Sequence, residues 1–157
     1  AIGGYPEWLN FSEDVVFNLR VRDKFGPFAF APEAIAYFRP RPSMGVFARQ
    51  YCNYAMGDGM ARLFPHIHLI RYFTYLVVLP LGIVAVVMVS RWLLLLGVLA
   101  WLSYIRLPFR RLVGMWDDLS LAERVRAVML LPLIRVVGDC AKMVGYPIGV
   151  WSRLRAR

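Results

Sequence analysis

Residues 72–90 read YFTYLVVLPLGIVAVVMVS, a stretch that has no charged side chain and is rich in Val, Leu and Ile. As a helix rising about 1.5 Å per residue, it would be about 28 Å long, close to the roughly 30 Å of a bilayer's hydrocarbon core. The next apolar run, WLLLLGVLAWLSYI at 92–105, begins after Arg91 and ends at Arg106. It would be only about 21 Å long, so it spans if these arginines reach toward the headgroups or the bilayer thins. The two runs predict a transmembrane hairpin within residues 66–111.

The positive charges of the chain gather at the ends of the apolar runs. The formal net charge is +9 and hydrophobic residues make up 59% of the sequence. Basic residues lie where lipid headgroups would be and form no soluble basic face with interleaved aromatic side chains, which indicates membrane lipids and not nucleic acid as partners. The flanking arginines are Arg62 and Arg71 before the hairpin, Arg106, Arg110 and Arg111 after it, and Arg91 in its turn. The positive-inside rule then predicts a multi-pass protein of the plasma (inner) membrane, with both ends in the cytoplasm.

Residues 112–157 follow the hairpin and are predicted to form an amphipathic helix and a basic tail. Arg135, Asp139 and Lys142 interrupt the apolar pattern at i, i+4 and i+7, which places them on one polar stripe where Arg135 and Asp139 can pair. A helix with such a stripe lies in the plane of the membrane interface. A third transmembrane span is the alternative, although three charges inside the bilayer would be costly.

Residues 1–65 carry signals of both helices and strands. Residues 3–6 (GGYP) are a turn signal, and Ser12 is predicted to cap a helix whose first turn is acidic. Gly26, which is followed by proline, is predicted to end that helix.

Two short apolar segments, 28–30 and 35–38, are predicted to be strands joined by a turn. Ser43 is predicted to cap a second helix that extends to about residue 63, with a possible interruption at 57–59 (GDG). The predicted fold class is therefore an α/β fragment followed by an α-helical transmembrane hairpin and an amphipathic interfacial helix.

Acidic residues at the first helix start are the strongest candidates for chemistry. The helix dipole stabilises a carboxylate such as Asp14 there, and a carboxylate in a cleft can accept a proton from an attacking hydroxyl as a general base. The ordinary alternative is that Glu13 and Asp14 only stabilise the first turn of the helix. Trp8 either stacks on a sugar or packs beneath the loop.

Other candidate sites rest on shorter patterns. His66 and His68 could contribute two ligands to an incomplete metal site, or be interfacial histidines. Residues 57–59 form either an anion-binding nest or a helix break. Cys52 and Cys140 make no disulfide framework and are expected to be free, half-buried thiols.

The glycine pair, the Glu-Asp helix start and the segments that follow resemble, in this order, the acceptor-side motif of family-2 glycosyltransferases. These are inverting enzymes with a GT-A fold, in which the catalytic aspartate lies under the anomeric carbon of the donor sugar. The resemblance implies that Asp14 is the general base, that Glu13 precedes it in the motif, and that Gly3 and Gly4 are the glycine pair.

The segment RQYCNYAMG at 49–57 is similar to the family's Gln-x-x-Arg-Trp region, whose polar residues approach the acceptor and the departing diphosphate. The resemblance implies acceptor or diphosphate contacts for Arg49, Gln50, Asn53 and Tyr54. Tyr54 replaces the usual tryptophan, and Asn53 stands where the family usually has arginine, so Arg49 is expected to compensate.

The resemblance implies a membrane-bound hexosyltransferase that moves a sugar from a nucleotide sugar to a lipid-linked or polysaccharide acceptor. Residues 1–65 would be the acceptor-side part of the catalytic domain, at the cytoplasmic face, 66–111 the hairpin, and 112–157 the interfacial helix. Mg²⁺ or Mn²⁺ would be bound mainly by a nucleotide-binding half that this segment lacks, so the segment alone is expected to be inactive and to hold no metal. The alternatives are a non-enzymatic membrane adaptor and a part of a polysaccharide export or transport assembly.

Overall fold

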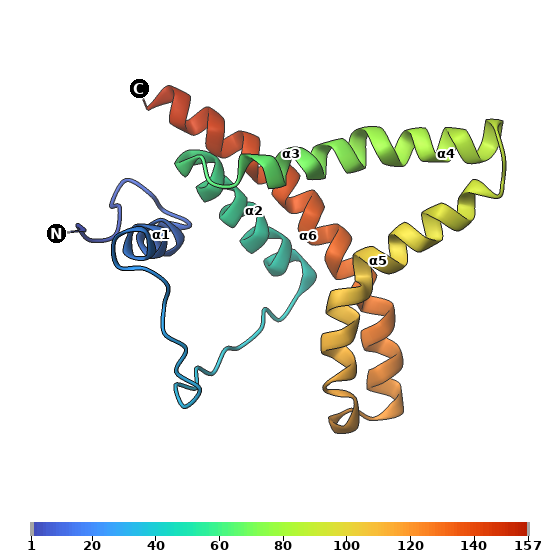
Figure 1. Cartoon of the computed structure of the whole chain (residues 1–157), viewed down its shortest axis with the longest axis horizontal. Helices are drawn as coiled ribbons and strands as arrows, with labels where there is room; N and C mark the ends of the chain where they lie inside the picture. The colour runs from blue at the N-terminus through green and yellow to red at the C-terminus, as the bar shows by residue number, and fades with distance from the viewer. Residues whose placement is uncertain (1, 157) are drawn as a thin grey trace. The chain divides into compact units, whose positions relative to one another are not determined.

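The computed structural model describes residues 2–156 and contains only helices as regular secondary structure in that range (Figure 1). The elements are α1 (Glu13–Phe25), α2 (Met44–Ala61), α3 (Pro65–Phe73), the π-helix η1 (Thr74–Val78), α4 (Leu79–Met88), α5 (Leu93–Val113), the 3₁₀ helix η2 (Trp116–Asp118) and α6 (Leu121–Arg155). Helices account for 74% of the chain. The predicted α/β fold class is therefore wrong, and the described chain is all-helical. Ala1 and Arg157, the outer ends of the first and last predicted segments, lie outside the described residues.

The predicted strands at 28–30 and 35–38 are absent from the described residues. The turn between them does form, with the amide of Ala34 donating to the carbonyl of Ala31 at 3.1 Å, but no strand ladder follows. Phe30 and Tyr37 remain 89% and 96% exposed. An isolated two-stranded hairpin is marginally stable at best, because a strand needs a partner backbone and an apolar surface to cover. The two apolar segments are therefore present in the sequence, but the described chain supplies no sheet for them to join.

Both helices predicted in the first part of the chain are present. The first begins at Glu13 and ends before Gly26, whose φ of 89° lies in the region that favours glycine. The second begins after Ser43, whose hydroxyl accepts from the amide of Val46, and continues to Ala61 without a break at residues 57–59. The interruption and the anion-binding nest considered for residues 57–59 are both wrong, because these residues are helical.

The chain divides into two compact units. The first contains the described residues up to His68 together with those from Cys140 onward, and the second runs from Leu69 to Asp139. The long helix α6 and the short helix α3 therefore each contribute residues to both units.

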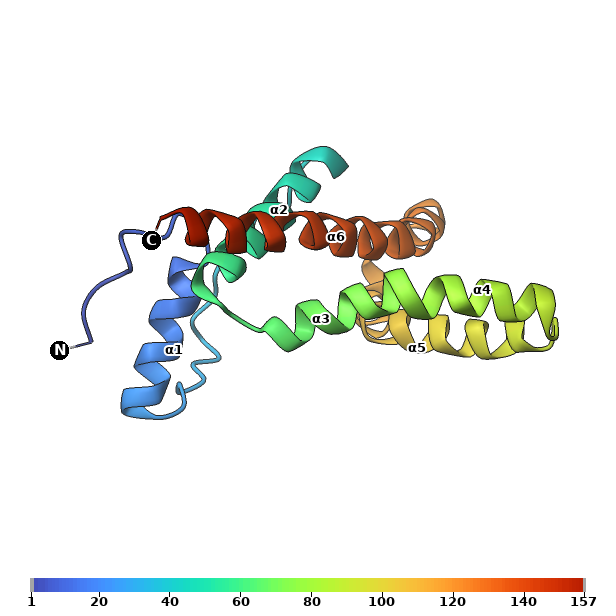
Figure 2. The same cartoon turned by 90° about the horizontal axis from the view of Figure 1, so that it is seen from above.

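In the first unit, α2 packs against the C-terminal part of α6 (Figure 2). Glycines at the contact allow the two helix backbones to approach closely. A Cβ at Gly149 would lie 1.9 Å from the carbonyl oxygen of Met56, and a Cβ at Gly145 would lie 2.0 Å from that of Cys52. Both separations are far below a van der Waals contact, so only glycine permits the approach. The two glycines are four residues apart and therefore lie on one face of α6. This small-xxx-small spacing lets two helix backbones pack closely.

Two helices are long and apolar enough to cross a membrane, at Pro65–Met88 and Leu93–Val113, and their apolar side chains point outward. This confirms the predicted pair of apolar segments and favours association with a membrane. The first helix passes through α3, η1 and α4. Its π-helical turn precedes Pro80, which has no amide hydrogen to donate, and local π adjustment is a common way for membrane helices to accommodate proline.

The second membrane-length helix is longer than the apolar run that predicted it. α5 continues past Arg106 and Pro108 to Val113, giving 21 residues, or about 31 Å of helix. The helix is thus long enough to span, but its uncharged part still ends at Arg106, so the arginine side chains must reach toward the headgroups, as predicted for the shorter run. α6 is one helix of 35 residues and is not among the helices that are long and apolar enough to span.

The predicted pairing of Arg135 with Asp139 is wrong. The carboxylate of Asp139 accepts a hydrogen bond from Nε of Arg71 at 2.8 Å and one from the hydroxyl of Tyr75 at 3.2 Å. The guanidinium of Arg135 instead lies 4.5 Å from the centre of the Tyr104 ring. Burial alone would raise the pKa of Asp139, but hydrogen bonds from Tyr104 and Arg71 and the charge of Arg71 outweigh it and hold that pKa below its usual value.

Candidate functional site

The start of α1 is fixed to α2 by the side chain of Ser12. Ser12 is the N-cap residue, as predicted, but its φ of 61° is left-handed and its hydroxyl does not cap its own helix. The hydroxyl instead reaches the carbonyl oxygen of Tyr54 at 3.1 Å and the carboxylate of Asp58 at 3.2 Å, and the residue is buried. The predicted cap interaction is therefore replaced by a contact between segments 46 residues apart. It holds the acidic first turn of α1 next to α2.

Asp14 and Glu13 lie in the first turn of α1, with Asp14 exposed and Glu13 half-buried. Within residues 2–156, neither carboxylate forms a side-chain hydrogen bond or an ion pair. The amide end of the helix favours negative charge at this position. Asp14 therefore presents an accessible carboxylate at a helix start that the side chain of Ser12 connects to α2.

A second set of polar contacts extends from Asp58 into α3. The other carboxylate oxygen of Asp58 lies 3.3 Å from Nε2 of His68, which is only 3% exposed. The imidazole stacks on Tyr146 of α6, with ring centroids 3.9 Å apart and planes inclined by 18°. His66, two residues earlier, is exposed. His68 is therefore engaged inside the unit and lies in no described group of three or more possible metal ligands. Its burial excludes an interfacial place for His68, whereas the interfacial place of the exposed His66 stays a prediction.

Of the polar residues predicted on α2, Gln50 and Tyr54 contact each other. The amide oxygen of Gln50 accepts from Nε of Arg41 at 2.8 Å, and its amide nitrogen donates to the hydroxyl of Tyr54. The structure therefore brings Gln50 and Tyr54 together, as one helical turn would. The sequence analysis did not identify Arg41 as a contact of Gln50. The feature that could have indicated it is its position in the proline-containing loop just before α2. Arg49 is exposed and Asn53 half-buried, and neither makes a side-chain hydrogen bond or ion pair within the described residues.

The glycine pair and Trp8 lie in the loop before α1. Gly3 has a φ of 75° and Gly4 lies at a bend, with open space around both. The loop is tied to α1 by Tyr5, whose ring stacks on Phe17 with centroids 4.7 Å apart. Trp8 is 56% exposed, so most of its ring is accessible to a ligand and it is not packed beneath the loop.

The described residues do not form a metal site. No group of three or more His, Cys, Asp or Glu side chains close enough to hold a metal ion occurs between residues 2 and 156. The carboxylate of Asp58 contacts Ser12 just before α1, and it is already engaged in hydrogen bonds with Ser12 and His68. These residues therefore do not fit a divalent cation.

Comparisons of the chain with protein-family models, with curated proteins and with solved structures find no match. The function is therefore inferred from the residues and their geometry.

Proposed function

We propose that this chain is the acceptor-side and membrane-anchoring part of a glycosyltransferase. It would help to transfer a sugar from a nucleotide sugar to a lipid-linked or polysaccharide acceptor, with inversion at the anomeric carbon. The catalytic base is Asp14. Gln50, Arg49, Asn53 and Tyr54 contact the acceptor or the departing diphosphate.

The observation that carries the proposal is the exposed carboxylate of Asp14 at a helix start that Ser12 bonds to α2. The same helix α2 presents Gln50 and Tyr54 in mutual hydrogen-bond contact. The two parts of the resemblance to family-2 glycosyltransferases, which are separated in the sequence, thus belong to one compact unit. This supports a shared site but rests on the resemblance for the identity of the substrates.

The proposed chemistry follows from these groups. Asp14 removes the proton from an acceptor hydroxyl while the hydroxyl oxygen bonds to the anomeric carbon of the donor sugar. The bond from that carbon to the diphosphate oxygen breaks as the new bond forms, and the proton remains on Asp14. Gln50 donates and accepts hydrogen bonds through one planar amide, so it can orient a sugar hydroxyl. The exposed guanidinium of Arg49 offers positive charge to a leaving diphosphate.

The proposal includes attachment of the catalytic unit to a membrane, which the two apolar helices support. The arginines flank the hairpin on the side of both chain ends, whereas Arg91 alone marks its turn, so the catalytic unit faces the cytoplasm at the inner membrane. Membrane lipids are the expected contacts of both helices, and an acceptor attached to a lipid would lie in the same membrane.

The test uses membranes that contain the full-length protein in which this chain occurs. They would be supplied with labelled nucleotide sugars in the presence of Mg²⁺ or Mn²⁺, and label entering lipid or polymer would be measured. Asp14→Asn is expected to reduce transfer by about 10²- to 10⁴-fold, because a general base typically contributes that much. Asp23→Asn is the matched control, since Asp23 is an exposed aspartate in the last turns of the same helix; it is expected to retain transfer.

Equal transfer by the Asp14→Asn protein and the native protein would remove Asp14 from the mechanism. A membrane adaptor is the second candidate, and the exposed aromatic side chains between α1 and α2, Phe30 and Tyr37, favour it because they offer a partner an apolar surface. The adaptor predicts no transfer from any common donor, and no effect of replacing Asp14 or Gln50.

A further inference from the structure

The segment just before α1 lies directly against α2. A Cβ at Gly57 would lie 2.2 Å from the carbonyl oxygen of Phe11 and 2.8 Å from the hydroxyl oxygen of Ser12. Both separations are far below a van der Waals contact, so only glycine permits this approach. Ser12 is 6% exposed at the contact. The first turn of α1 therefore follows a backbone that is packed on α2, although the side chain of Asp14 stays open to solvent.

Ser12 has a backbone conformation that its surroundings must maintain. Its φ of 61° and ψ of 18° are left-handed, which is unfavourable for a residue with a Cβ. Such strain persists only where the surrounding structure over-determines it, and strained residues gather at functional sites. The carbonyl of Ser12 also accepts the first hydrogen bond of α1, from the amide of Val16 at 3.1 Å. A change in the conformation of Ser12 would therefore redirect α1 from its first turn.

The carboxylate of Asp58 connects α2 to two other segments. Its Oδ1 accepts a hydrogen bond from the hydroxyl of Ser12 at 3.2 Å, and its Oδ2 lies 3.3 Å from Nε2 of His68 in α3. The side chain is 19% exposed, so water shields it little, and a hydrogen bond to a charged group is stronger in such surroundings than in water. Asp58 therefore holds the side chain of the strained residue Ser12 against α2.

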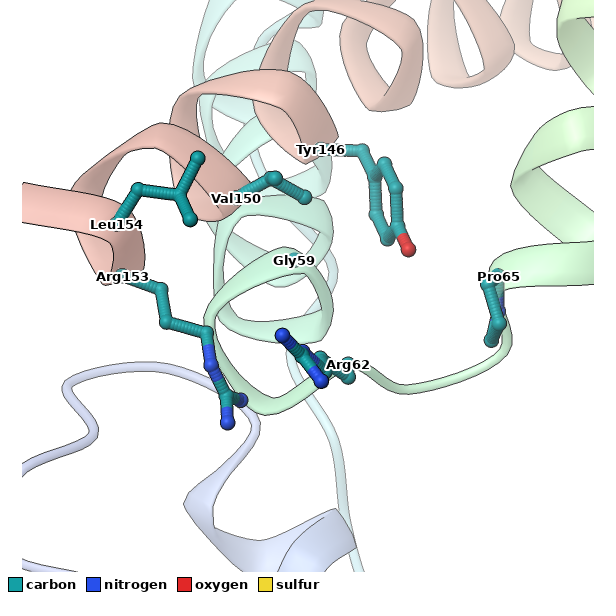
Figure 3. A pocket seen from close by; sticks show the side chains of 7 residues that line it. All are labelled: Gly59, Arg62, Pro65, Tyr146, Val150, Arg153 and Leu154. Atoms are coloured by element: carbon teal, nitrogen blue, oxygen red, sulfur yellow. The ribbon is translucent and has the colours of Figure 1, made fainter.

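The position of Asp58 is itself constrained by His68. The histidine is 3% exposed, and its ring stacks on Tyr146 with centroids 3.9 Å apart. Figure 3 shows Tyr146 projecting from α6 between α2 and Pro65, the first residue of α3. Three helices therefore meet around His68, and Asp58 has little freedom to turn away from Ser12.

We propose that Asp58 is a positioning residue for sugar transfer, which acts on the candidate base Asp14 through Ser12. Gly57 lets the segment before α1 reach α2, and Asp58 then fixes the direction in which α1 leaves this contact. Asp14, two residues beyond Ser12, is thereby held where it can meet the acceptor hydroxyl. A displacement of about 1 Å at a reacting group can cost about 10²-fold in rate. This role rests on the proposed function, since it requires Asp14 to be the base.

The test measures kcat and KM of the full-length protein in membranes, with the labelled nucleotide sugar that native membranes transfer. Asp58→Leu removes both acceptor oxygens at nearly the same shape, whereas Asp58→Asn keeps one oxygen that accepts from the hydroxyl of Ser12. Asp139→Leu is the matched control, because Asp139 also accepts hydrogen bonds from other segments but belongs to the second unit. Circular dichroism of the purified variants gives the folded fraction to which transfer is normalised.

A second pair of variants disturbs the same contact from the backbone. Gly57→Ala places a Cβ against the carbonyl oxygen of Phe11, so the segment before α1 must move away from α2. Gly45→Ala is its control, because it adds the same methyl group to α2 where nothing lies within 4 Å. If Asp58→Leu does not fold, Asp58→Asn and Gly57→Ala still decide the question.

Asp58→Leu and Gly57→Ala are each expected to lower kcat by about 10²-fold. The KM for the nucleotide sugar is expected to stay the same, because a displaced base weakens an interaction that is made only in the transition state. Asp58→Asn is expected to recover about tenfold of that loss, since one hydrogen bond to Ser12 is restored. Asp139→Leu and Gly45→Ala are expected to keep the native kcat per folded molecule.

Native kcat in folded Asp58→Leu or Gly57→Ala protein would overturn the positioning role. So would a raised KM with unchanged kcat, which would indicate substrate binding by Asp58, and so would equal losses in Asp58→Leu and Asp139→Leu. Asp14→Asn in the same assay separates this failure from failure of the proposed function. Transfer that is lost in Asp14→Asn but kept in Asp58→Leu rejects only the positioning role, whereas transfer that is kept in Asp14→Asn rejects the base itself.

Discussion

The helix pair α2–α6 and the helix pair α4–α5 are held together in different ways. Where α2 meets α6, glycines bring two backbones together so closely that a Cβ would overlap a carbonyl oxygen. In the α4–α5 hairpin, Gly82 and Gly97 have open space around them, and large apolar side chains such as Leu96 point outward. The first pair is closed by the chain itself, whereas the second leaves its apolar surface for the hydrocarbon of a bilayer to cover. The helix glycines therefore differ in role: those of α6 permit close backbone packing, whereas Gly82 and Gly97 contact no other segment.

The largest expected effect comes from placing the same methyl group in each pair. Gly149→Ala puts a Cβ 1.9 Å from the carbonyl oxygen of Met56, so α2 and α6 must separate. We expect a loss of about 3 kcal/mol from the free energy of unfolding, the upper part of the range for overpacking. Thermal unfolding of the full-length protein in detergent, followed by circular dichroism, measures it.

Gly97→Ala is the matched control, because it adds the same methyl group to α5 where nothing lies within 4 Å. Alanine is a better helix former than glycine by about 1 kcal/mol, so this variant is expected to be at least as stable as the native protein. Equal effects of the two substitutions would show that the contrast between the helix pairs is wrong.

A smaller effect is expected from the polar contacts of the second unit. Asp139→Ala removes the acceptor of Arg71 and of Tyr75, and we expect a loss of about 2 kcal/mol, typical of a hydrogen bond to a charged group. Because the folded state lowers the pKa of Asp139, its contribution to stability is complete above the unfolded pKa near 4 and is lost as pH falls through the folded pKa.

Acid unfolding checks this sign. The native protein is expected to lose stability below about pH 4, and the Asp139→Ala protein to lose less over the same interval, because the linked group is gone. Arg135→Ala is a useful comparison, since Arg135 contacts the Tyr104 ring and not Asp139. If both variants shared the pH dependence of the native protein, Asp139 would not be its source.

The smallest expected effect concerns the contact that fixes the candidate base. Ser12→Ala removes the hydrogen bonds from Ser12 to Tyr54 and Asp58, and we expect a loss of about 1 kcal/mol in the free energy of unfolding. Sugar transfer by the full-length protein is expected to fall by more than this loss of stability explains, because Asp14 follows Ser12 by two residues. Ser43→Ala, at the start of α2, is the control for the loss of a serine near a helix start. Transfer that stays normal in Ser12→Ala would mean that Asp14 does not depend on this contact.

The residues of the candidate site could be predicted from the sequence, but most of the contacts between them could not. Serine before two acids indicated the start of α1, and Gln50 and Tyr54 lie one turn apart on any helix. The bond from Ser12 to Asp58 was not predictable, since a serine before a helix normally caps that helix. Arg41 was missed because nothing local to its loop specifies a partner nine residues away.

The sequence by itself determined the local elements: the apolar runs that form two membrane-length helices, the serines that begin α1 and α2, and the glycine that ends α1. Each depends on side chains within a few residues of one another, so periodicity, capping and run length suffice. Only the tertiary structure decided which partners meet: Asp139 with Arg71 across 68 residues, and glycines 145 and 149 with α2. It also decided that residues 28–38 form no strand, because a strand needs backbone partners that no local pattern can supply.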